Sequence, residues 1–200
     1  MILAFCTVML FAKQNRQKIP AQIGSIEVIC GSMFSGKTEE LIHRLRRAPI
    51  AGLKIEVFRP KIDSRYDEFA IVSHDKNAIP AAAVEDAASI LSIRSDTQVV
   101  GIDEAQFFDQ QLPEVCETLA NLGIRVIVAG LDKDYLGKPF GPMPGLMAVA
   151  DSVTKLHAVC VVCGGEANFS FRTALHSTQV LIGEKESYEA RCRICYLEGV

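Results

Sequence analysis

The sequence predicts an α/β fold, in which a mostly parallel sheet is flanked by helices and followed by a small cysteine-rich domain. Apolar, strand-like segments alternate with helical segments between residues 23 and 150, which is typical of a parallel sheet. A glycine-rich loop joins the first strand to the first helix, and after residue 150 two Cys-x-x-Cys pairs interrupt short strand-like segments. We therefore divide the chain into an N-terminal extension (1–22), an α/β domain (23–150) and a small domain (151–200).

The composition is that of a folded protein with a sizeable core. Of the 200 residues, 49% are hydrophobic and 22% are charged, so disorder over the whole chain is excluded. The formal net charge of −3 argues against a nucleic-acid partner, because nucleic-acid-binding proteins usually have a basic surface. Small phosphorylated ligands remain compatible with this charge, since backbone groups can bind them.

The N-terminal extension begins with an apolar run over residues 1–12. No basic residue precedes this run, no small-residue cleavage pattern follows it, and it is too short to span a bilayer. We therefore expect a disordered extension on a cytoplasmic protein, with no membrane partner.

Each predicted element follows from a local pattern. Strands are predicted where β-type or continuous apolar runs occur, at residues 25–30, 54–58, 98–102 and 124–129. Helices are predicted at residues 39–47, 84–93 and 113–122. The last of these helices has proline at its start and glycine just past its end, as helix ends prefer. Residues 138–145 contain three prolines and are predicted to be a loop.

The glycine-rich loop matches the phosphate-loop pattern G-x-x-x-x-G-K-[ST]. Its residues are Gly31, Ser32, Met33, Phe34, Ser35, Gly36, Lys37 and Thr38. Glycines let successive backbone N–H groups face one anion, and the positive end of the next helix adds to the attraction. Lys37 can reach the β- and γ-phosphates of ATP, and the Thr38 hydroxyl can bind Mg²⁺. We therefore predict a phosphate-loop NTPase-like (RecA-like) domain.

Two carboxylates follow the apolar strand at residues 98–102. Asp103 stands where phosphate-loop proteins place an acid that holds Mg²⁺, usually through water. Glu104 follows it and can take a proton from an attacking hydroxyl or polarise a water molecule. Alternatively, the two acids could form a solvated turn with no function. The phosphate-loop motif in the same chain argues against that interpretation. The two motifs together predict γ-phosphoryl chemistry and leave the acceptor open.

The cysteine pairs predict one structural Zn²⁺ with four thiolate ligands: Cys160, Cys163, Cys192 and Cys195. The metal would close the long loop over residues 164–191 and so reduce the entropy cost of ordering that loop on a ligand. His157 is a further candidate ligand, and a redox role for either pair is a second alternative.

Some arginines and aromatic residues have less specific interpretations. Arg44, Arg46 and Arg47 lie toward the end of a predicted helix, where cations suit the helix dipole, so we expect a solvated face. Four aromatic residues can belong to the core or form a pocket for a flat base: Phe107, Phe108, Tyr135 and Phe140.

Taken in order, the motifs resemble those of the zinc-containing (type II) thymidine kinases, from about residue 24 to residue 196. The most specific are Met33-Phe34-Ser35 within the phosphate loop and Asp103-Glu104-Ala105-Gln106-Phe107-Phe108 after the strand. The others are Asp63-Ser64-Arg65-Tyr66, Leu131, Lys138-Pro139-Phe140-Gly141 and the two cysteine pairs.

The resemblance implies transfer of the γ-phosphoryl group of ATP to the 5′-hydroxyl of deoxythymidine or deoxyuridine, with Mg²⁺ in the reaction. Glu104 would be the base, and Arg65 would steady the transferring group. Around the nucleoside the resemblance places Met33, Asp63, Phe107, Leu131, Tyr135 and Phe140. The segment between the cysteine pairs resembles the lasso loop of the family, which covers the thymine through main-chain groups. Its candidates are Leu181, Ile182 and Gly183, with Tyr188 near the sugar.

The resemblance also implies a homotetramer and feedback inhibition by dTTP. The chain departs from the family pattern at two places. Many members have proline where Ser32 stands, and many have a second glycine where Glu184 follows Ile182-Gly183.

Two other functions explain fewer features. A phosphate-loop ATPase with a structural zinc ribbon would turn over ATP without a nucleoside, but it leaves the aromatic loop and the lasso unexplained. A zinc-ribbon nucleic-acid-binding module would need a basic surface around the metal, whereas glutamates balance the basic residues there.

Overall fold

The main body of the protein is a six-stranded sheet. The computed structural model describes residues 24–62, 70–72, 78–173 and 187–199. The sheet order is β5-β2-β6-β7-β1-β8, and every pairing in it is parallel. The strands are β1 Ser25–Gly31, β2 Ile55–Pro60, β5 Ala82–Val84, β6 Val99–Ile102, β7 Arg125–Leu131 and β8 Ser152–Leu156. The prediction of a mostly parallel sheet is confirmed.

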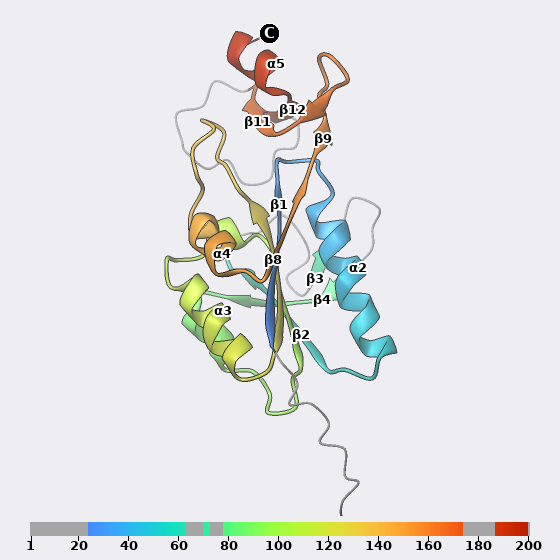
Figure 1. Cartoon of the computed structure of the whole chain (residues 1–200), viewed down its shortest axis with the longest axis vertical. Helices are drawn as coiled ribbons and strands as arrows, with labels where there is room; N and C mark the ends of the chain where they lie inside the picture. Colours follow the sequence, from blue (N-terminus) through green and yellow to red (C-terminus); the bar gives the residue numbers. More distant parts are fainter. Residues whose placement is uncertain (1–23, 63–69, 73–77, 174–186, 200) are drawn as a thin grey trace, which may run out of the picture.

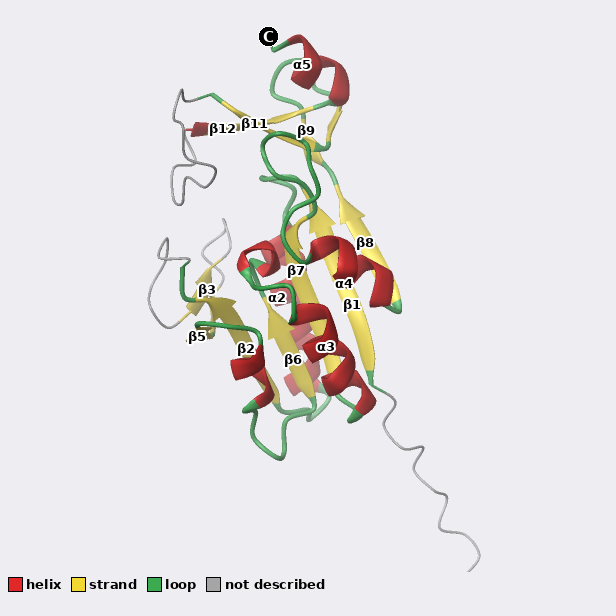
Figure 2. Cartoon of the chain, turned by 90° about the vertical axis from the view of Figure 1, so that its left-hand side faces the viewer, coloured by secondary structure: helices red, strands yellow, loops and turns green. Residues whose placement is uncertain are grey.

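Helices cover both faces of this sheet, so the body has three layers (Figures 1 and 2). Helix α2, Lys37–Ile50, lies on one face, whereas α3, Leu112–Asn121, and α4, Met143–Val149, lie on the other. Side chains alternate along β1, so that Val28 packs with the α3 and α4 core and Ile29 packs with the α2 core. The central strands β6 and β7 are thus buried on both faces, as their continuous apolar sequences predict, whereas the edge strands β5 and β8 are largely exposed.

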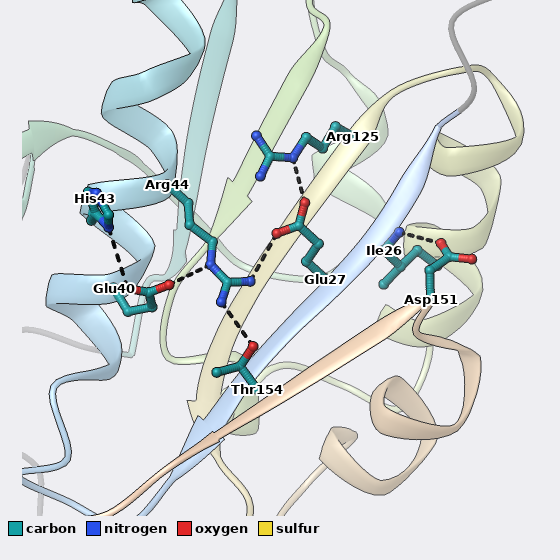
Figure 3. Close-up of polar contacts among 8 residues, drawn as sticks. All are labelled: Ile26, Glu27, Glu40, His43, Arg44, Arg125, Asp151 and Thr154. Carbon is teal, nitrogen blue, oxygen red and sulfur yellow. Dashed lines mark hydrogen bonds and ion pairs between the residues drawn. The ribbon is translucent and has the colours of Figure 1, made fainter.

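An ionic network joins α2 to three strands (Figure 3). Glu27 of β1 accepts hydrogen bonds from Arg125 of β7 (2.5 Å) and Arg44 of α2 (2.9 Å). Arg44 also donates to Glu40, one turn earlier in α2, and to Thr154 of β8. The prediction of a solvated face is therefore wrong for Arg44, although Arg46 and Arg47 are exposed.

A small domain follows the sheet and lies at the upper end of the molecule in Figure 1. It contains short antiparallel pairs and a short helix: β9 Ala158–Val159, β10 Glu166–Ala167, β11 Phe169–Arg172, β12 Tyr188–Arg191 and α5 Arg193–Glu198. A further antiparallel pair, β3 Ala70–Val72 and β4 Ala78–Pro80, is separate from the main sheet. The main sheet itself continues past residue 150, because its edge strand β8 ends at Leu156.

Two predicted elements are wrong. Residues 84–93 do not form one helix: Val84 ends strand β5, which pairs with β2, and only Ala88–Leu91 form a 3₁₀ turn, η1. The Asp86 carboxylate accepts from both the N–H and the hydroxyl of Ser89, which fixes this short turn locally. Residues 143–145 of the predicted loop begin α4, because proline is tolerated in the first turn of a helix, where its missing N–H is not needed.

In the part of the chain that the structure describes, no helix is both long and apolar enough to cross a membrane.

Candidate active site

The phosphate loop leaves the carboxyl end of β1 and enters α2. Gly31 has φ 147°, and a Cβ there would lie 2.3 Å from the Leu156 carbonyl oxygen of β8, so only glycine fits. Gly36 precedes α2 in the left-handed conformation, with φ 82°. Within the loop, the Ser35 hydroxyl and the Lys37 ammonium each donate to the Ser32 carbonyl oxygen at 2.8 Å. The loop therefore has the backbone course of an anion-binding turn, with its lysine folded over it.

A hydroxyl and a carboxylate meet beside this loop. The Thr38 hydroxyl donates to one carboxylate oxygen of Asp103 over 3.3 Å, and the Glu104 N–H donates to the other over 2.9 Å. Burial, and then the neighbouring charge of Glu104, raise the pKa of Asp103 to about 7. A divalent cation would offset both effects by favouring the ionised form. This pair of oxygen ligands fits Mg²⁺, which takes a few protein oxygens together with water and phosphate.

Glu104 has an unusual backbone conformation. Its φ of 51° lies in the left-handed region, which non-glycine residues rarely adopt. The strained position falls where the chain turns from β6 into the 3₁₀ turn η2, Ala105–Phe107. Such outliers persist only where the surroundings hold them, and they cluster at functional sites. The Glu104 carboxylate accepts a hydrogen bond of 2.5 Å from the Gln106 side chain.

An aromatic pair lies next to these acids. The rings of Phe107 and Phe140 meet edge to face, with centroids 5.6 Å apart. Phe140 belongs to the loop after β7, and its N–H donates to the Asp132 carbonyl oxygen. The tip of this loop is held by Asp134, whose carboxylate accepts from the N–H groups of Leu136 and Lys138 at 2.9 Å each. The loop over residues 131–141 is therefore a folded arm rather than a random connection.

Four cysteine sulfur atoms gather in the small domain. The Sγ atoms of Cys160, Cys163, Cys192 and Cys195 all lie within 4.8 Å of one another. The Sγ atoms of Cys163 and Cys192 are 3.7 Å apart, close to the ~3.8 Å that Zn–S bonds of about 2.3 Å give in a tetrahedron. The donor set fits a structural Zn²⁺.

The small domain contacts the phosphate loop directly. The Met33 N–H donates to the Ser170 hydroxyl of β11 over 3.0 Å, and the Ser32 hydroxyl donates to the Ala167 carbonyl oxygen over 3.4 Å. Helix α5 contributes the Tyr196 hydroxyl, which donates to the Tyr135 carbonyl oxygen at 2.8 Å. The cysteine-bearing domain therefore braces both the phosphate loop and the arm after β7.

Comparisons with known proteins show the family to which this chain belongs. A family model described as thymidine kinase matches residues 24–196. A protein named thymidine kinase from Porphyromonas gingivalis (strain ATCC 33277) is 62% identical over 183 residues, which cover 92% of this chain and 90% of that protein. The chain belongs to the thymidine kinase family. A second relative of that name, from Bacteroides thetaiotaomicron, is 56% identical over 192 residues and covers 96% of both chains.

Among solved structures, the Legionella pneumophila ATPase DotB overlaps 64% of this chain and 34% of its own, with 16% identity. Its TM-score of 0.39 is too low to bear on the fold or the function of this thymidine kinase family member.

The structure brings together many residues that the sequence singles out. The phosphate loop, Asp103 and Glu104 lie at the carboxyl ends of the parallel strands β1 and β6. Leu131 is the last residue of β7, at the same end of the sheet. Tyr135 and Tyr188 are joined by Arg172, whose guanidinium lies 3.9 Å from the Tyr135 ring centroid and donates to the Tyr188 hydroxyl at 2.6 Å. The other candidates lie outside the described residues: Asp63, Arg65, Leu181, Ile182 and Gly183.

Sequence reasoning missed several residues of this thymidine kinase site. Gln106 lies within the motif after β6, but the motif alone gives it no role. Ser170 and Arg172 lie far along the chain from the residues that they contact, so no local pattern could pair them. An ion pair was also missed: the buried Asp132 carboxylate lies 2.6 Å from the partly exposed Lys155 ammonium of β8.

Proposed function

We propose that this chain transfers the γ-phosphoryl group of ATP to the 5′-hydroxyl of deoxythymidine, and also of deoxyuridine. The observation that supports this most directly is the position of Glu104. Glu104 is the next residue after Asp103, which pairs with Thr38 beside the phosphate loop. A proton acceptor therefore lies next to the proposed position of a metal-bound phosphate. Membership of the thymidine kinase family supports the choice of acceptor.

On the donor side, residues of the phosphate loop bind the nucleotide. N–H groups of the phosphate loop and of the start of α2 would face the phosphates, apart from that of Met33, which donates to Ser170. Lys37 would extend to the β- and γ-phosphates. Thr38 and Asp103 would hold Mg²⁺, which supplies charge neutralisation at the transferring group when bound. To reach the phosphates, the Lys37 ammonium must exchange its hydrogen bond to the Ser32 carbonyl oxygen for phosphate oxygens.

On the acceptor side, Glu104 takes the proton. The 5′-oxygen forms a bond to the γ-phosphorus, the bond from that phosphorus to the bridging oxygen breaks, and ADP leaves with the electron pair. The hydroxyl proton passes to the Glu104 carboxylate. We assign Arg65 to the transferring group on the family resemblance, because phosphoryl transfer depends mainly on positioning and charge.

The nucleoside would bind against the aromatic pair and the arm after β7. The proposed pocket is formed by six residues: Met33, Asp63, Phe107, Leu131, Tyr135 and Phe140. Its edge-to-face rings suit a flat base. We assign Leu181, Ile182 and Gly183 to a lasso that binds thymine through main-chain groups, with Tyr188 near the sugar. Such contacts would accept uracil and reject cytosine, because the 4-amino group reverses one hydrogen-bonding edge.

The test is an assay of ADP release with Mg-ATP, run without an acceptor and with each of the four deoxynucleosides. We expect release that depends on deoxythymidine, also occurs with deoxyuridine in a separate reaction, and is absent with deoxycytidine. Equal release under all conditions would instead identify an ATPase. Efficient phosphorylation of deoxycytidine would contradict the main-chain recognition of the base.

The role of Glu104 has its own test. Glu104→Gln keeps the side-chain size but cannot accept the proton, so we expect kcat to fall by about 10²- to 10⁴-fold. Binding of ATP and of deoxythymidine, measured by calorimetry, should change little. The matched control is Glu117→Gln on the exposed side of α3, which should leave kcat unchanged. Near-normal turnover of the Glu104 variant would overturn its assignment as the base.

We further propose one structural Zn²⁺ per chain, bound by Cys160, Cys163, Cys192 and Cys195, whose sulfur positions fit that metal. The family resemblance supports a cytoplasmic homotetramer with feedback inhibition by dTTP. Sedimentation of the purified protein tests the tetramer, and inhibition of ADP release by dTTP tests the feedback.

A further inference from the structure

Gln106 lies between the candidate base and the end of strand β7. Only 2% of its surface is exposed. Its Nε2 donates to Glu104 Oε2 over 2.5 Å, and its Oε1 accepts from the Leu131 N–H over 2.9 Å. One buried amide therefore spans the gap between the loop that follows β6 and the strand beside it.

The direction of this amide is fixed by its partners. A backbone N–H can only donate, so the side-chain oxygen must face Leu131. The NH₂ group must then face Glu104, which is an acceptor when ionised. Glutamine is thus suited to this position, because it offers an acceptor at one end of its side-chain amide and a donor at the other.

The surrounding backbone leaves little room for the amide to move. A Cβ at Gly130 would lie 3.0 Å from Gln106 Oε1, so the adjacent strand packs closely on the amide. A Cβ at Gly141 would lie 2.2 Å from the Gln106 carbonyl oxygen, so the arm after β7 packs on its backbone. Gln106 is therefore enclosed by β7 on one side and by the base of the arm on another.

Glu104 is held at two points by this arrangement. Its backbone N–H is bound to Asp103, and its carboxylate is bound to Gln106. The second contact links the Glu104 carboxylate, through Gln106, to the Leu131 N–H at the end of β7. Strand β7 lies between β6 and the phosphate-loop strand β1. A base held in this way keeps one geometry relative to the phosphate loop, which general base catalysis requires.

We infer that Gln106 is a positioning residue for Glu104: its buried amide, anchored on the Leu131 N–H, orients the carboxylate that accepts the 5′-hydroxyl proton. This inference rests on the proposed function. Gln106 does not itself accept the proton. Gln106 also connects Glu104 to Leu131, which is part of the proposed nucleoside pocket. Glu104 and Leu131 are thus both bound to the same side-chain amide.

The test compares Gln106→Met, which has a similar length and no hydrogen-bonding group, with the parent protein. We expect kcat to fall by about 10- to 100-fold, while KM for ATP and for deoxythymidine stays within about twofold. The control is Gln111→Met at the exposed start of α3, which should change neither constant. Unchanged kcat, or a loss confined to KM, would overturn the inference.

A double-mutant cycle separates positioning from a merely structural role. In the Glu104→Gln background, Gln106→Met should cause no further loss of single-turnover rate, because no carboxylate remains to be oriented. Losses that multiply would show that Gln106 acts independently of Glu104, and would contradict the inference.

A second variant covers the case in which Gln106→Met does not fold. Gln106→Asn keeps the amide but is one methylene shorter, so it can reach the Leu131 N–H or Glu104 but cannot span both. We expect a smaller fall in melting temperature than with Gln106→Met, together with the same selective loss of kcat, and normal kcat would contradict the inference. If the parent shows no deoxythymidine-dependent ADP release, the proposed function fails. If the parent is active and only Glu104→Gln is impaired, the role of Gln106 alone fails.

Discussion

Glu27 is a carboxylate that the fold holds in its ionised form. Burial raises its pKa, but hydrogen bonds and charges from Arg125 and Arg44 outweigh this effect and lower the pKa below its ordinary value of 4.5. Only 17% of its side chain is exposed, so solvent screens the two ion pairs only in part. Because Glu27 joins β1, β7 and α2, its ionisation contributes to the stability of the strand that leads into the phosphate loop.

The lowered pKa makes this contribution depend on pH. A carboxyl group with a lower pKa in the folded state stabilises the protein above its unfolded pKa, and the effect is lost as pH falls through the folded value. We expect Glu27→Gln to lower the free energy of unfolding by about 2 kcal/mol at pH 7. The difference from the parent, measured by urea unfolding, should shrink below pH 4.5. Glu85→Gln, which breaks an exposed pair with Lys61, should have almost no effect at either pH.

At the scale of single residues, contiguous motifs were predictable and distant partners were not. Thr38 and Asp103 could be predicted to lie together because short motifs contain them, and the structure places the Thr38 hydroxyl against the Asp103 carboxylate. The sequence predicts a solvated Arg44, because helical position alone does not show that Glu27 lies within reach. The role of Gln106 needed the Leu131 N–H, which comes from another strand.

Among the elements, β7 and β8 are joined by an ion pair between a buried aspartate and a partly exposed lysine. Asp132, 5% exposed, follows β7 and lies 2.6 Å from Lys155 on β8. The other carboxylate oxygen of Asp132 is buried and has no hydrogen-bond partner among the described residues. The carbonyl oxygen of Asp132 also holds Phe140. The pair therefore fixes the start of the arm over residues 131–141 to the edge strand that leads into the small domain.

Removing the lysine should be more harmful than removing both charges. Lys155→Met leaves Asp132 buried without its main counter-charge, and we expect the free energy of unfolding to fall by about 2 kcal/mol, since Lys155 is itself partly exposed. The double variant Asp132→Asn with Lys155→Met should recover part of this loss in urea unfolding. Lys54→Met, which breaks an exposed pair with Asp96, serves as the control and should have little effect. Equal losses in the single and double variants would argue against a buried-charge penalty.

Elements with strong local patterns were predicted well. The strands buried on both faces have continuous apolar sequences, and α3 has proline at its start. Residues 84–93 were predicted wrongly because the pairing of β5 with β2 overrides a weak helical preference. Local sequence does not record which strand occupies the edge of a sheet.

In the molecule as a whole, the small domain that holds the cysteine cluster contacts the phosphate loop, which lies far from it in the sequence. Ser170 binds the Met33 N–H, and the Lys133 ammonium lies 3.8 Å from the Phe169 ring centroid. These contacts join the small domain to the α/β domain, and no sequence motif predicts them. The cluster of four cysteines could be predicted from their spacing, whereas the contact of the small domain with the phosphate loop could be seen only in three dimensions.

This arrangement predicts that metal loss will affect nucleotide handling. We expect Cys163→Ser to lower the zinc content from about one per chain to near zero after dialysis against a chelator. Because the small domain would no longer brace Met33, KM for ATP should rise and kcat should fall. The control is Cys116→Ala in α3, a buried thiol outside the cluster, which should retain its zinc. Full activity in a zinc-free preparation would contradict the proposed brace.

The position of β1 in the sheet has a consequence for how the protein is made. β1 is the first described strand to be synthesised, yet its two neighbours are β7 and β8, and the Ile26 N–H is bound to a carboxylate 125 residues later in the chain. The nucleotide-binding turn is thus translated early but stays without its supporting strands until most of the chain has left the ribosome. Such long-range pairing slows folding. A nascent or prematurely ended chain would contain the turn's full sequence and still be unable to bind ATP.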